Sequence, residues 1–227
     1  MQHRTGIAPF AIIALGLGLL TRTLLAQDES KSALETDPQG WLDIFPAGDL
    51  TGWTRLPIPP TAKLGGPQWT VDTAHKLLIC DGTGGHDWLR YDRELGDFIF
   101  HVEWRYTPVP GKTGYNSGVF VRNSSDARIW HQAQVGSSSG GYLFGDTPLD
   151  GKVQRFNFRD QVKQHRVRPA GEWNTYEITC RGKTISLWVN GAVTNRWTEC
   201  PVPRGHIGVE GEGWRIEFKN LRLKELR

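Results

Sequence analysis

The segment FIFHVEWRY at residues 98–106 limits the possible folds more than any other part of this chain. Every second residue from Phe98 to Tyr106 is large and apolar, whereas the positions between them include His101, Glu103 and Arg105. Successive side chains of a β-strand point to opposite faces of a sheet. The pattern therefore predicts a strand with one apolar face and one charged face.

Similar short runs recur along the chain, and no stretch of a dozen residues shows the apolar period of an amphipathic helix. Asn190-Gly191 predicts a two-residue hairpin turn, because both residues tolerate a positive φ. The runs expected to form strands cover residues 77–80, 98–106, 119–122, 129–135, 175–181, 185–189, 193–197, 206–210 and 214–223. This pattern predicts an all-β fold, a jelly-roll sandwich of two antiparallel sheets.

The segments between these strands contain two long connections, residues 56–68 and 136–151, which are rich in Pro, Gly and Ser. We expect both to be loops at the rim of a binding site. His86 and Asp87 follow a glycine-rich stretch and are expected to lie in a turn. No His-x-His or His-Glu-x-x-His spacing indicates a metal site.

The composition limits the classes of function. The 227 residues suffice for one domain of ordinary size. A total of 27 Lys and Arg against 24 Asp and Glu gives a net charge of +3, too small and too evenly spread for a nucleic-acid-binding surface. The ten Trp residues could offer flat apolar surfaces to a ligand, although Trp is also a common core residue.

The N-terminus has the features of a secretory signal. Arg4 precedes an apolar run of 14 residues, 7–20, and a small residue follows at Ala26. The run is shorter than the roughly 20 residues of a membrane-spanning helix, so we expect no stable membrane insertion. We expect residues 1–26 to be a signal peptide, 27–40 a flexible leader and 41–227 the folded domain of a periplasmic or extracellular protein.

Export would permit disulfides, and three cysteines leave at least one unpaired. Cys180 and Cys200 flank the expected hairpin and could meet at one end of it, whereas Cys80 lies in a separate run. The sequence leaves this pairing open. No Cys-x-x-Cys pair indicates a structural zinc site.

Six blocks of the sequence resemble the 3-keto-disaccharide hydrolase domain family in order and spacing. They are WLDIFPAGDLTGW (41–53), GDFIFHVEWR (96–105), NSGVFVR (116–122), AGEWNTYEIT (170–179), VNG (189–191) and GHIGVEGEGWRIEFKNLRL (205–223). The resemblance covers essentially the whole expected domain. It implies a concanavalin A-like jelly roll that acts on sugars.

The same resemblance implies cleavage of a glycoside that a separate sugar 3-dehydrogenase has already oxidised at C3. A ketone at C3 acidifies the proton on C2, so a modest base can form an enediolate, the C1 oxygen can leave, and water can add to the enone. Such a path needs a base near C2, a stabiliser of the charge on O3 and an acid at the leaving oxygen. The sequence indicates no cofactor and leaves a metal requirement open.

The first set of candidate site residues lies on the charged face of the 98–106 strand. Glu103 and Arg105 project from that face, and Arg122 and Gln134 on other strands could join them to bind sugar hydroxyls. Trp130 and Trp188 could stack on a sugar ring. These charges could instead form cross-strand salt bridges on a solvated face, but Glu103, Arg105, Arg122 and Gln134 match family blocks.

A second set comes from the run HIGVEGEGW at 206–214. Glu210 and Glu212 share a face if the strand stays regular through Gly211, whereas a bulge there would separate them. A common family pattern has Gln where this chain has Glu210, His where it has Glu212, and Glu where it has Gln132. A Gln cannot take up a proton and a Glu can, so Glu103 and Glu212 become the leading candidates for the base.

We therefore assign Glu103 or Glu212 as base or acid and Arg122 as the stabiliser of the O3 charge. The expected sugar ligands are Arg105, Gln132, Gln134, Trp130, Trp188 and Glu210. Each single His is more often structural than catalytic. Two alternatives remain open, a non-catalytic lectin-like domain and an ordinary retaining glycosidase, although the Glu-x-Asp-x-x-Glu run of sandwich glucanases is absent.

Overall fold

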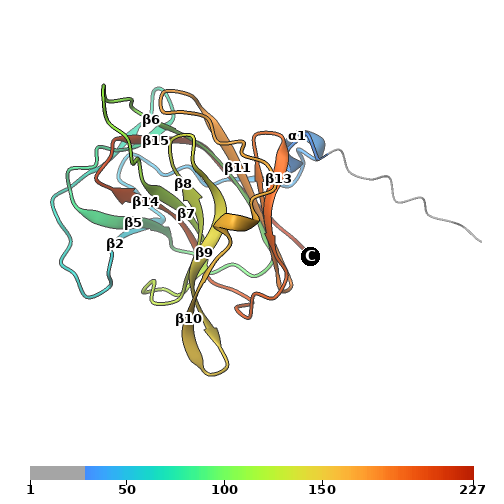
Figure 1. Cartoon of the computed structure of the whole chain (residues 1–227). Coiled ribbons are helices and arrows are strands. Elements are labelled where there is room, and N and C mark those ends of the chain that lie inside the picture. The colour runs from blue at the N-terminus through green and yellow to red at the C-terminus, as the bar shows by residue number, and fades with distance from the viewer. Residues whose placement is uncertain (1–28) are drawn as a thin grey trace, which may run out of the picture.

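A computed structural model describes residues 29–227 as two antiparallel sheets packed face to face (Figure 1). Each sheet presents one face to its partner and one face outward, which we call its outer face. The predicted all-β sandwich is confirmed. The expected signal peptide, residues 1–26, lies outside the described residues. No helix within residues 29–227 is long and apolar enough to cross a membrane.

The first sheet has eight strands. Its order is β13 (Ala192–Trp197), β12 (Thr184–Val189), β11 (Asn174–Arg181), β6 (Phe98–Tyr106), β15 (Ile216–Glu225), β4 (Leu77–Cys80) and β3 (Trp69–Asp72), with the short β1 (Leu42–Asp43) paired to β15. All of these pairs are antiparallel.

The second sheet has seven strands. Its order is β10 (Lys152–Asn157), β9 (Gly140–Leu149), β8 (Trp130–Val135), β7 (Ser117–Asn123), β14 (His206–Glu212), β5 (His86–Tyr91) and β2 (Trp53–Pro57). The described residues also form two short helices, α1 (Ala33–Thr36) and the 3-10 helix η1 (Arg159–Gln161).

The core lies between the inner faces of the two sheets, as the alternation in β6 predicts. Phe100, Val102 and Trp104 are buried, and the ring of Trp104 lies 5.4 Å from the ring of Tyr176 on β11. The seven-stranded sheet contributes Val119 and other buried apolar residues to the same cluster. Removal of this surface from water is the main stabilisation of such a sandwich.

The turn between β12 and β13 confirms the predicted hairpin. Asn190 has φ of 43° and Gly191 has φ of 98°, the positive values that a two-residue type I′ turn requires. The side chain of Asn190 also accepts a hydrogen bond from the backbone N–H of Thr175 at 2.8 Å. Local turn chemistry therefore determines the register of this hairpin.

The predicted loop at 136–151 is wrong over most of its length, because residues 140–149 form β9. The predicted turn at His86 and Asp87 is also wrong, because both residues begin β5. The glycine content of β9 was misleading. A Cβ at Gly145 would lie 2.0 Å from the carbonyl oxygen of Trp130, so glycine here permits close pairing with β8.

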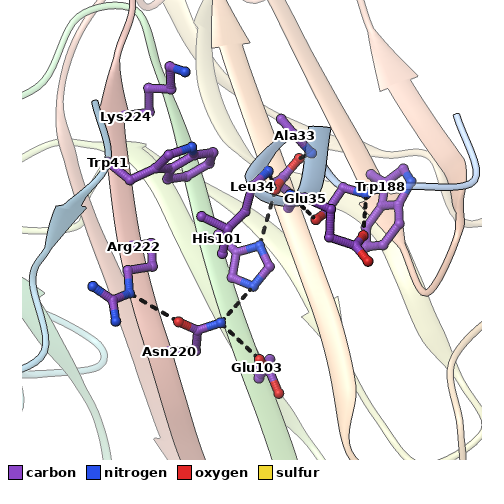
Figure 2. A network of polar contacts seen from close by, with 12 residues as sticks. Ala33, Leu34, Glu35, Trp41, His101, Glu103, Trp188, Asn220, Arg222 and Lys224 are labelled. Carbon is purple, nitrogen blue, oxygen red and sulfur yellow. Dashed lines mark hydrogen bonds and ion pairs between the residues drawn. The ribbon is translucent and has the colours of Figure 1, made fainter. Parts of the chain in front are cut away.

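Part of the expected leader, residues 29–37, contacts the outer face of the eight-stranded sheet. Helix α1 begins with a capping box formed by Ser32 and Glu35. The carboxylate of Glu177 on β11 accepts hydrogen bonds from the backbone N–H groups of Ala33, at 2.6 Å, and Leu34, at 3.2 Å (Figure 2). An anionic group at exposed helical N–H groups is favourable, so this contact anchors the segment.

The three cysteines are described, and none of them is paired with another. Cys80, Cys180 and Cys200 are all buried. Burial raises the pKa of Cys80 to about 12 and raises that of Cys200 as well. The thiols therefore stay protonated at neutral pH and behave as small apolar core groups.

Candidate active site

A pocket of about 440 Å³ lies on the outer face of the seven-stranded sheet. Its size falls within the roughly 300–1,000 Å³ that is usual for small-molecule sites. One end is lined by polar residues, namely His86, Asn116, Gln132, Gln134, Glu210 and Glu212. The other end is aromatic, with Trp130 in ring contact with Phe120 and Phe144, and the pocket is also lined by Ile58, Pro59, Pro60, Ala127, Arg128, Asp146 and Arg155.

The two carboxylates of the polar end come from β14. The pairing of β14 with β5 stays in register, with Glu210 opposite Trp88 and Glu212 opposite His86. Glu210 and Glu212 therefore share one face, and no bulge separates them. Gly211 faces the other way, where an added Cβ would lie 2.7 Å from Sγ of Cys80. Close packing behind the strand explains the glycine between the two acids.

A connected set of hydrogen bonds holds these groups. His86 Nε2 lies 2.7 Å from Oε1 of Glu210 and 3.9 Å from Oε2 of Glu212. Gln132 Nε2 donates to Oε2 of Glu210 at 3.0 Å, and Asn116 Nδ2 donates to Oε2 of Glu212. Gln134 Nε2 in turn donates to Oδ1 of Asn116 at 2.6 Å. The amides thus orient the carboxylates from behind.

A glycine on β7 makes this arrangement possible. A Cβ at Gly118 would lie 2.1 Å from Nε2 of Gln132, so any larger residue would displace that amide. With glycine at 118, the Gln132 side chain reaches both the carbonyl of Ser117, at 3.2 Å, and Glu210. The glycine in the block NSGVFVR therefore has a role in shaping the site.

The protonation states of Glu210 and His86 depend on each other. Burial raises the pKa of Glu210 and the charge of Glu212 adds to this, whereas the hydrogen bond from His86 acts in the opposite direction. Burial lowers the pKa of His86, but its hydrogen bond to Glu210 and the charges of Glu210 and Glu212 outweigh burial and leave the pKa raised. The site therefore retains a proton to higher pH than isolated side chains would, as suits proton transfer.

The same three residues could hold a metal ion. Ligand atoms of His86, Glu210 and Glu212 lie within 4.8 Å of one another. Among residues 29–227 this is the one cluster of three or more His, Cys, Asp or Glu side chains that are close enough to share a metal ion. Imidazole and carboxylate are suitable ligands for a divalent cation such as Zn²⁺ or Mn²⁺. The polar end can therefore act either by proton transfer alone or with a cation.

Trp130 dominates the aromatic end and is held in a fixed orientation. Its Nε1 donates to Oδ2 of Asp146 at 3.0 Å, and the guanidinium of Arg155 lies 5.0 Å from its ring centroid. The rings of Phe120 and Phe144 approach it edge to face, at 6.3 Å and 5.0 Å. The structure therefore places Trp130 in the pocket with Gln132, Gln134, Glu210 and Glu212, as the sequence-based assignment requires.

The structure does not bring Glu103 and Arg105 to this pocket. Both lie on the outer face of the eight-stranded sheet, on the other side of the sandwich. Glu103 accepts a hydrogen bond from Asn220 Nδ2 at 2.9 Å (Figure 2). It also pairs with Lys219 Nζ at 3.3 Å. Arg105 pairs with Glu217 at 2.6 Å. The prediction that Glu103 and Arg105 share a polar face with Gln134 is wrong. Alternation shows which side chains of one strand lie on the same face, but it does not show which sheet the strand joins.

Arg122 is also absent from the pocket. Its side chain is fully buried, and its guanidinium donates to the carbonyl oxygens of Gly182, at 2.6 Å, and Val202, at 3.1 Å, and to Asp97 at 2.9 Å. The residue has φ of 52°, a left-handed conformation that breaks the alternation of β7. Arg122 thus ties three connections between strands to the sheet, those that contain Asp97, Gly182 and Val202. It is a structural residue, and its expected role as stabiliser of an O3 charge is corrected.

Trp188 lies on β12 of the eight-stranded sheet, beside α1 (Figure 2). Its Nε1 donates to the backbone carbonyl of Glu29 at 2.7 Å. The N-terminal segment therefore accepts the hydrogen bond of the indole N–H of Trp188. Trp188 contacts this segment rather than the pocket.

The sequence-based assignment contains five of the sixteen lining residues and missed, among others, His86, Asn116, Phe144, Asp146 and Arg155. His86, Phe144 and Asp146 lie in segments that were expected to be turn or loop. Asn116 directly precedes β7 and begins a family block, which was the available signal. His101 and His131, by contrast, are buried away from the pocket, and burial lowers the pKa of His131 to about 4.

Solved structures share this fold. A protein named "putative glycosyl hydrolase" from Parabacteroides distasonis is 16% identical, with a TM-score of 0.59, over 87% of this chain and 99% of that one. A carbohydrate-binding module from Bacillus subtilis is 14% identical, with a TM-score of 0.54, over 77% and 96%. A β-glucanase from Bacillus licheniformis is 12% identical, with a TM-score of 0.50, over 78% and 94%. At these identities the likeness shows the fold alone.

No curated protein matches the chain. A family model, described as a 3-keto-alpha-glucoside-1,2-lyase-like domain, matches residues 40–224, which include every strand of the sandwich except the last residue of β15. This match confirms the resemblance found in the sequence blocks. The chain therefore belongs to the 3-keto-alpha-glucoside-1,2-lyase-like domain family.

Proposed function

We propose that the protein is a sugar-active enzyme that cleaves glycosides already oxidised to the ketone at C3. The observation that carries this proposal is the group of Glu210, Glu212 and His86 in the pocket, within a domain of this family. Two carboxylates and an imidazole at one end of a pocket suit the removal of a proton next to a carbonyl.

The proposed reaction has two steps. A base removes the proton on C2, the electron pair forms the enediolate with the C3 carbonyl, and the C1–O bond then breaks with a proton going to the leaving oxygen. Water next adds across the C1=C2 bond, with hydroxyl to C1 and a proton to C2. The sum is hydrolysis, and no oxidant is consumed.

Glu212 is the proposed base. Its side chain is about one-third exposed, whereas Glu210 is buried. The protonated His86 supplies the positive charge near O3 that we had assigned to Arg122, because its raised pKa favours the imidazolium. The amide oxygens of Gln132, Gln134 and Asn116 offer acceptor positions for the remaining sugar hydroxyls, whereas the N–H groups of Gln132 and Gln134 already donate within the protein.

Two of the departures from the common family pattern compensate each other in space. Where relatives have Glu at 132 and Gln at 210, this chain has Gln132 and Glu210, and these two side chains share a hydrogen bond of 3.0 Å. The pair therefore still consists of one carboxylate and one amide with the positions exchanged. The third departure, Glu212 in place of His, stands directly opposite His86 on β5. An imidazole thus remains beside the carboxylates.

The proposal extends to the cellular setting. The expected signal at residues 1–26 supports export to the periplasm or medium, and a sugar 3-dehydrogenase must supply the oxidised substrate. Mass measurement of protein from the cell envelope or medium tests the first point, with a mature N-terminus expected near Gln27. Retention of residues 1–26 in a membrane fraction would contradict it.

The deciding experiment compares a 3-keto-glucoside with the same glucoside unoxidised. We expect cleavage of the ketone alone, and in D2O we expect deuterium at C2 of the released sugar. Assays with and without a chelator show whether a cation takes part. Cleavage of the unoxidised glucoside would indicate an ordinary glycosidase, and binding without cleavage of either sugar would indicate a lectin-like domain.

A further inference from the structure

The two ends of the pocket differ in the hydrogen-bonding capacity that they leave for a ligand. The polar end presents amides and carboxylates from β8, β14 and the residue before β7, together with the imidazole of His86 on β5, as a sugar with many hydroxyls requires. The aromatic end is lined mainly by the side chains of Ile58, Pro59, Phe120, Trp130 and Phe144. Both ends belong to one continuous pocket, so a single molecule can occupy both.

The polar groups at the aromatic end already bind one another. Asp146 accepts from Trp130 Nε1 at 3.0 Å and from both Nε and one terminal nitrogen of Arg155, the latter at 2.9 Å. Its carboxylate and the indole N–H are therefore occupied. Arg128 is mostly exposed and pairs with Asp126 at 3.2 Å. The groups that remain free at this end are guanidinium N–H groups at the solvent-exposed rim.

A second sugar ring at this end would lose hydrogen bonds to water and could regain them only from the guanidinium groups at the rim. Buried hydroxyls without partners are costly, whereas a flat apolar ring loses little on leaving water. Three aromatic rings held at edge-to-face angles offer further favourable contacts to another aromatic ring. The ends of the pocket thus match a polar ring joined to an aromatic one.

We infer that the aromatic end is the leaving-group subsite and that it takes an aromatic ring, so that the substrates are aryl glycosides rather than disaccharides. This inference rests on the proposed function for the direction of cleavage, with the oxidised sugar at the polar end. Trp130 and Phe144 are the specificity-determining residues of this subsite. They contact the leaving group and take no part in proton transfer.

The test measures binding and turnover separately. Calorimetry on the parent protein compares phenyl α-glucoside with methyl α-glucoside and an α-linked glucose disaccharide, none of them oxidised. The Glu212→Gln variant is then titrated with the corresponding 3-keto sugars, which it should not consume. We expect the phenyl compound to bind about 2- to 12-fold more tightly than the other two in each series, the range of one aromatic pair contact.

Single substitutions then show which residues cause the tighter binding of the phenyl glucoside. Trp130→Leu and Phe144→Leu should each reduce the preference for phenyl, whereas the matched Trp188→Leu variant on the other sheet should keep it. Two variants are used so that unfolding of one, checked by thermal melting, does not prevent the test. In the parent protein the phenyl advantage should appear in KM of the 3-keto sugars.

Three results would overturn the inference. They are disaccharide binding as tight as phenyl binding, an unchanged phenyl preference in both folded pocket variants, and no binding of any of these sugars. Failure of the proposed function looks different. In that case no 3-keto sugar is cleaved, while the phenyl preference and its dependence on Trp130 persist in the binding data.

Discussion

The two outer faces of the sandwich carry similar residues and differ in how their charges are paired. On the eight-stranded sheet Glu103 lies 3.3 Å from Lys219, and Glu217 lies 2.6 Å from Arg105. On the seven-stranded sheet Glu210 and Glu212 share one potentially cationic partner, His86, and their other partners are neutral amides. Charges that neutralise each other stabilise a surface, whereas carboxylates with too few cations remain available for a ligand or a proton. Incomplete pairing, rather than charge alone, distinguishes the candidate site.

The largest expected difference between the faces is in rate. Glu212→Gln keeps the size of the side chain but removes a proton acceptor, so turnover of a 3-keto-glucoside should fall by about 100- to 10,000-fold. Glu103→Gln is the matched control and should keep turnover within about twofold of the parent value, because surface pairs contribute little. Steady-state kinetics on both variants checks this. The opposite order of effects would move the reaction to the eight-stranded sheet.

Substitution of Arg122, which is buried inside the sandwich, shows whether this residue contributes to stability or to the reaction. Arg122→Met leaves the carbonyls of Gly182 and Val202 and the carboxylate of Asp97 without their donor, so we expect a loss of about 3 kcal/mol in the free energy of unfolding. Urea unfolding measures this loss. Turnover well below the melting temperature should stay near the parent value. Strong loss of turnover at unchanged stability would return Arg122 to the reacting group.

Turnover and stability should both depend on pH through the titration of His86, which lies on the outer face of the seven-stranded sheet. Its raised pKa keeps the imidazolium at pH values above the usual 6.5, so kcat/KM should fall as pH rises through a midpoint above 6.5. The stability that His86 gains from its charge is complete below pH 6.5 and is lost as pH rises through the folded-state pKa.

The His86→Gln variant is the comparison for both readouts. It should lack this limb of the rate profile, and the difference in melting temperature from the parent should shrink as pH rises. A profile that is the same in parent and variant would assign the limb to another group.

The smallest effect is expected at the N-terminal segment. Glu177→Gln weakens the charge-assisted hydrogen bonds to Ala33 and Leu34 and should lower the free energy of unfolding by about 1 kcal/mol. Amide hydrogen exchange should increase at residues 33 and 34, and turnover should not change. A loss of turnover would show that the two faces are coupled.

Alternation was sufficient to predict the sandwich and β6, whereas it left open whether Glu210 and Glu212 share a face, which the register of β14 with β5 settles. It could not tell which sheet a strand joins, and this error placed Glu103 beside Gln134. Sheet membership depends on contacts between residues far apart in the chain, such as the pairing of β6 with β11 and β15. A periodic pattern within one strand contains no information about those contacts.

The missed parts of the site have local causes. Gly145 reads as a loop residue, yet it is needed because β9 runs close to the backbone of Trp130. His86 follows four residues of Gly and Thr, and its strand mixes apolar and charged residues because the outer face of β5 holds both Trp88 and the pocket. Close backbone approach and a half-polar sheet face both weaken the sequence signal for a strand.

The packing of residues 29–37 on the eight-stranded sheet also bears on how the protein can be handled. This segment meets the sandwich on the side away from the pocket, beside Trp188 and Glu177. An affinity tag or a surface linker fused ahead of residue 29 is thus joined to the domain through the far side. Immobilisation through such a fusion should leave the pocket facing the solution, which makes this end suitable for sensor chips and for display of the protein on beads.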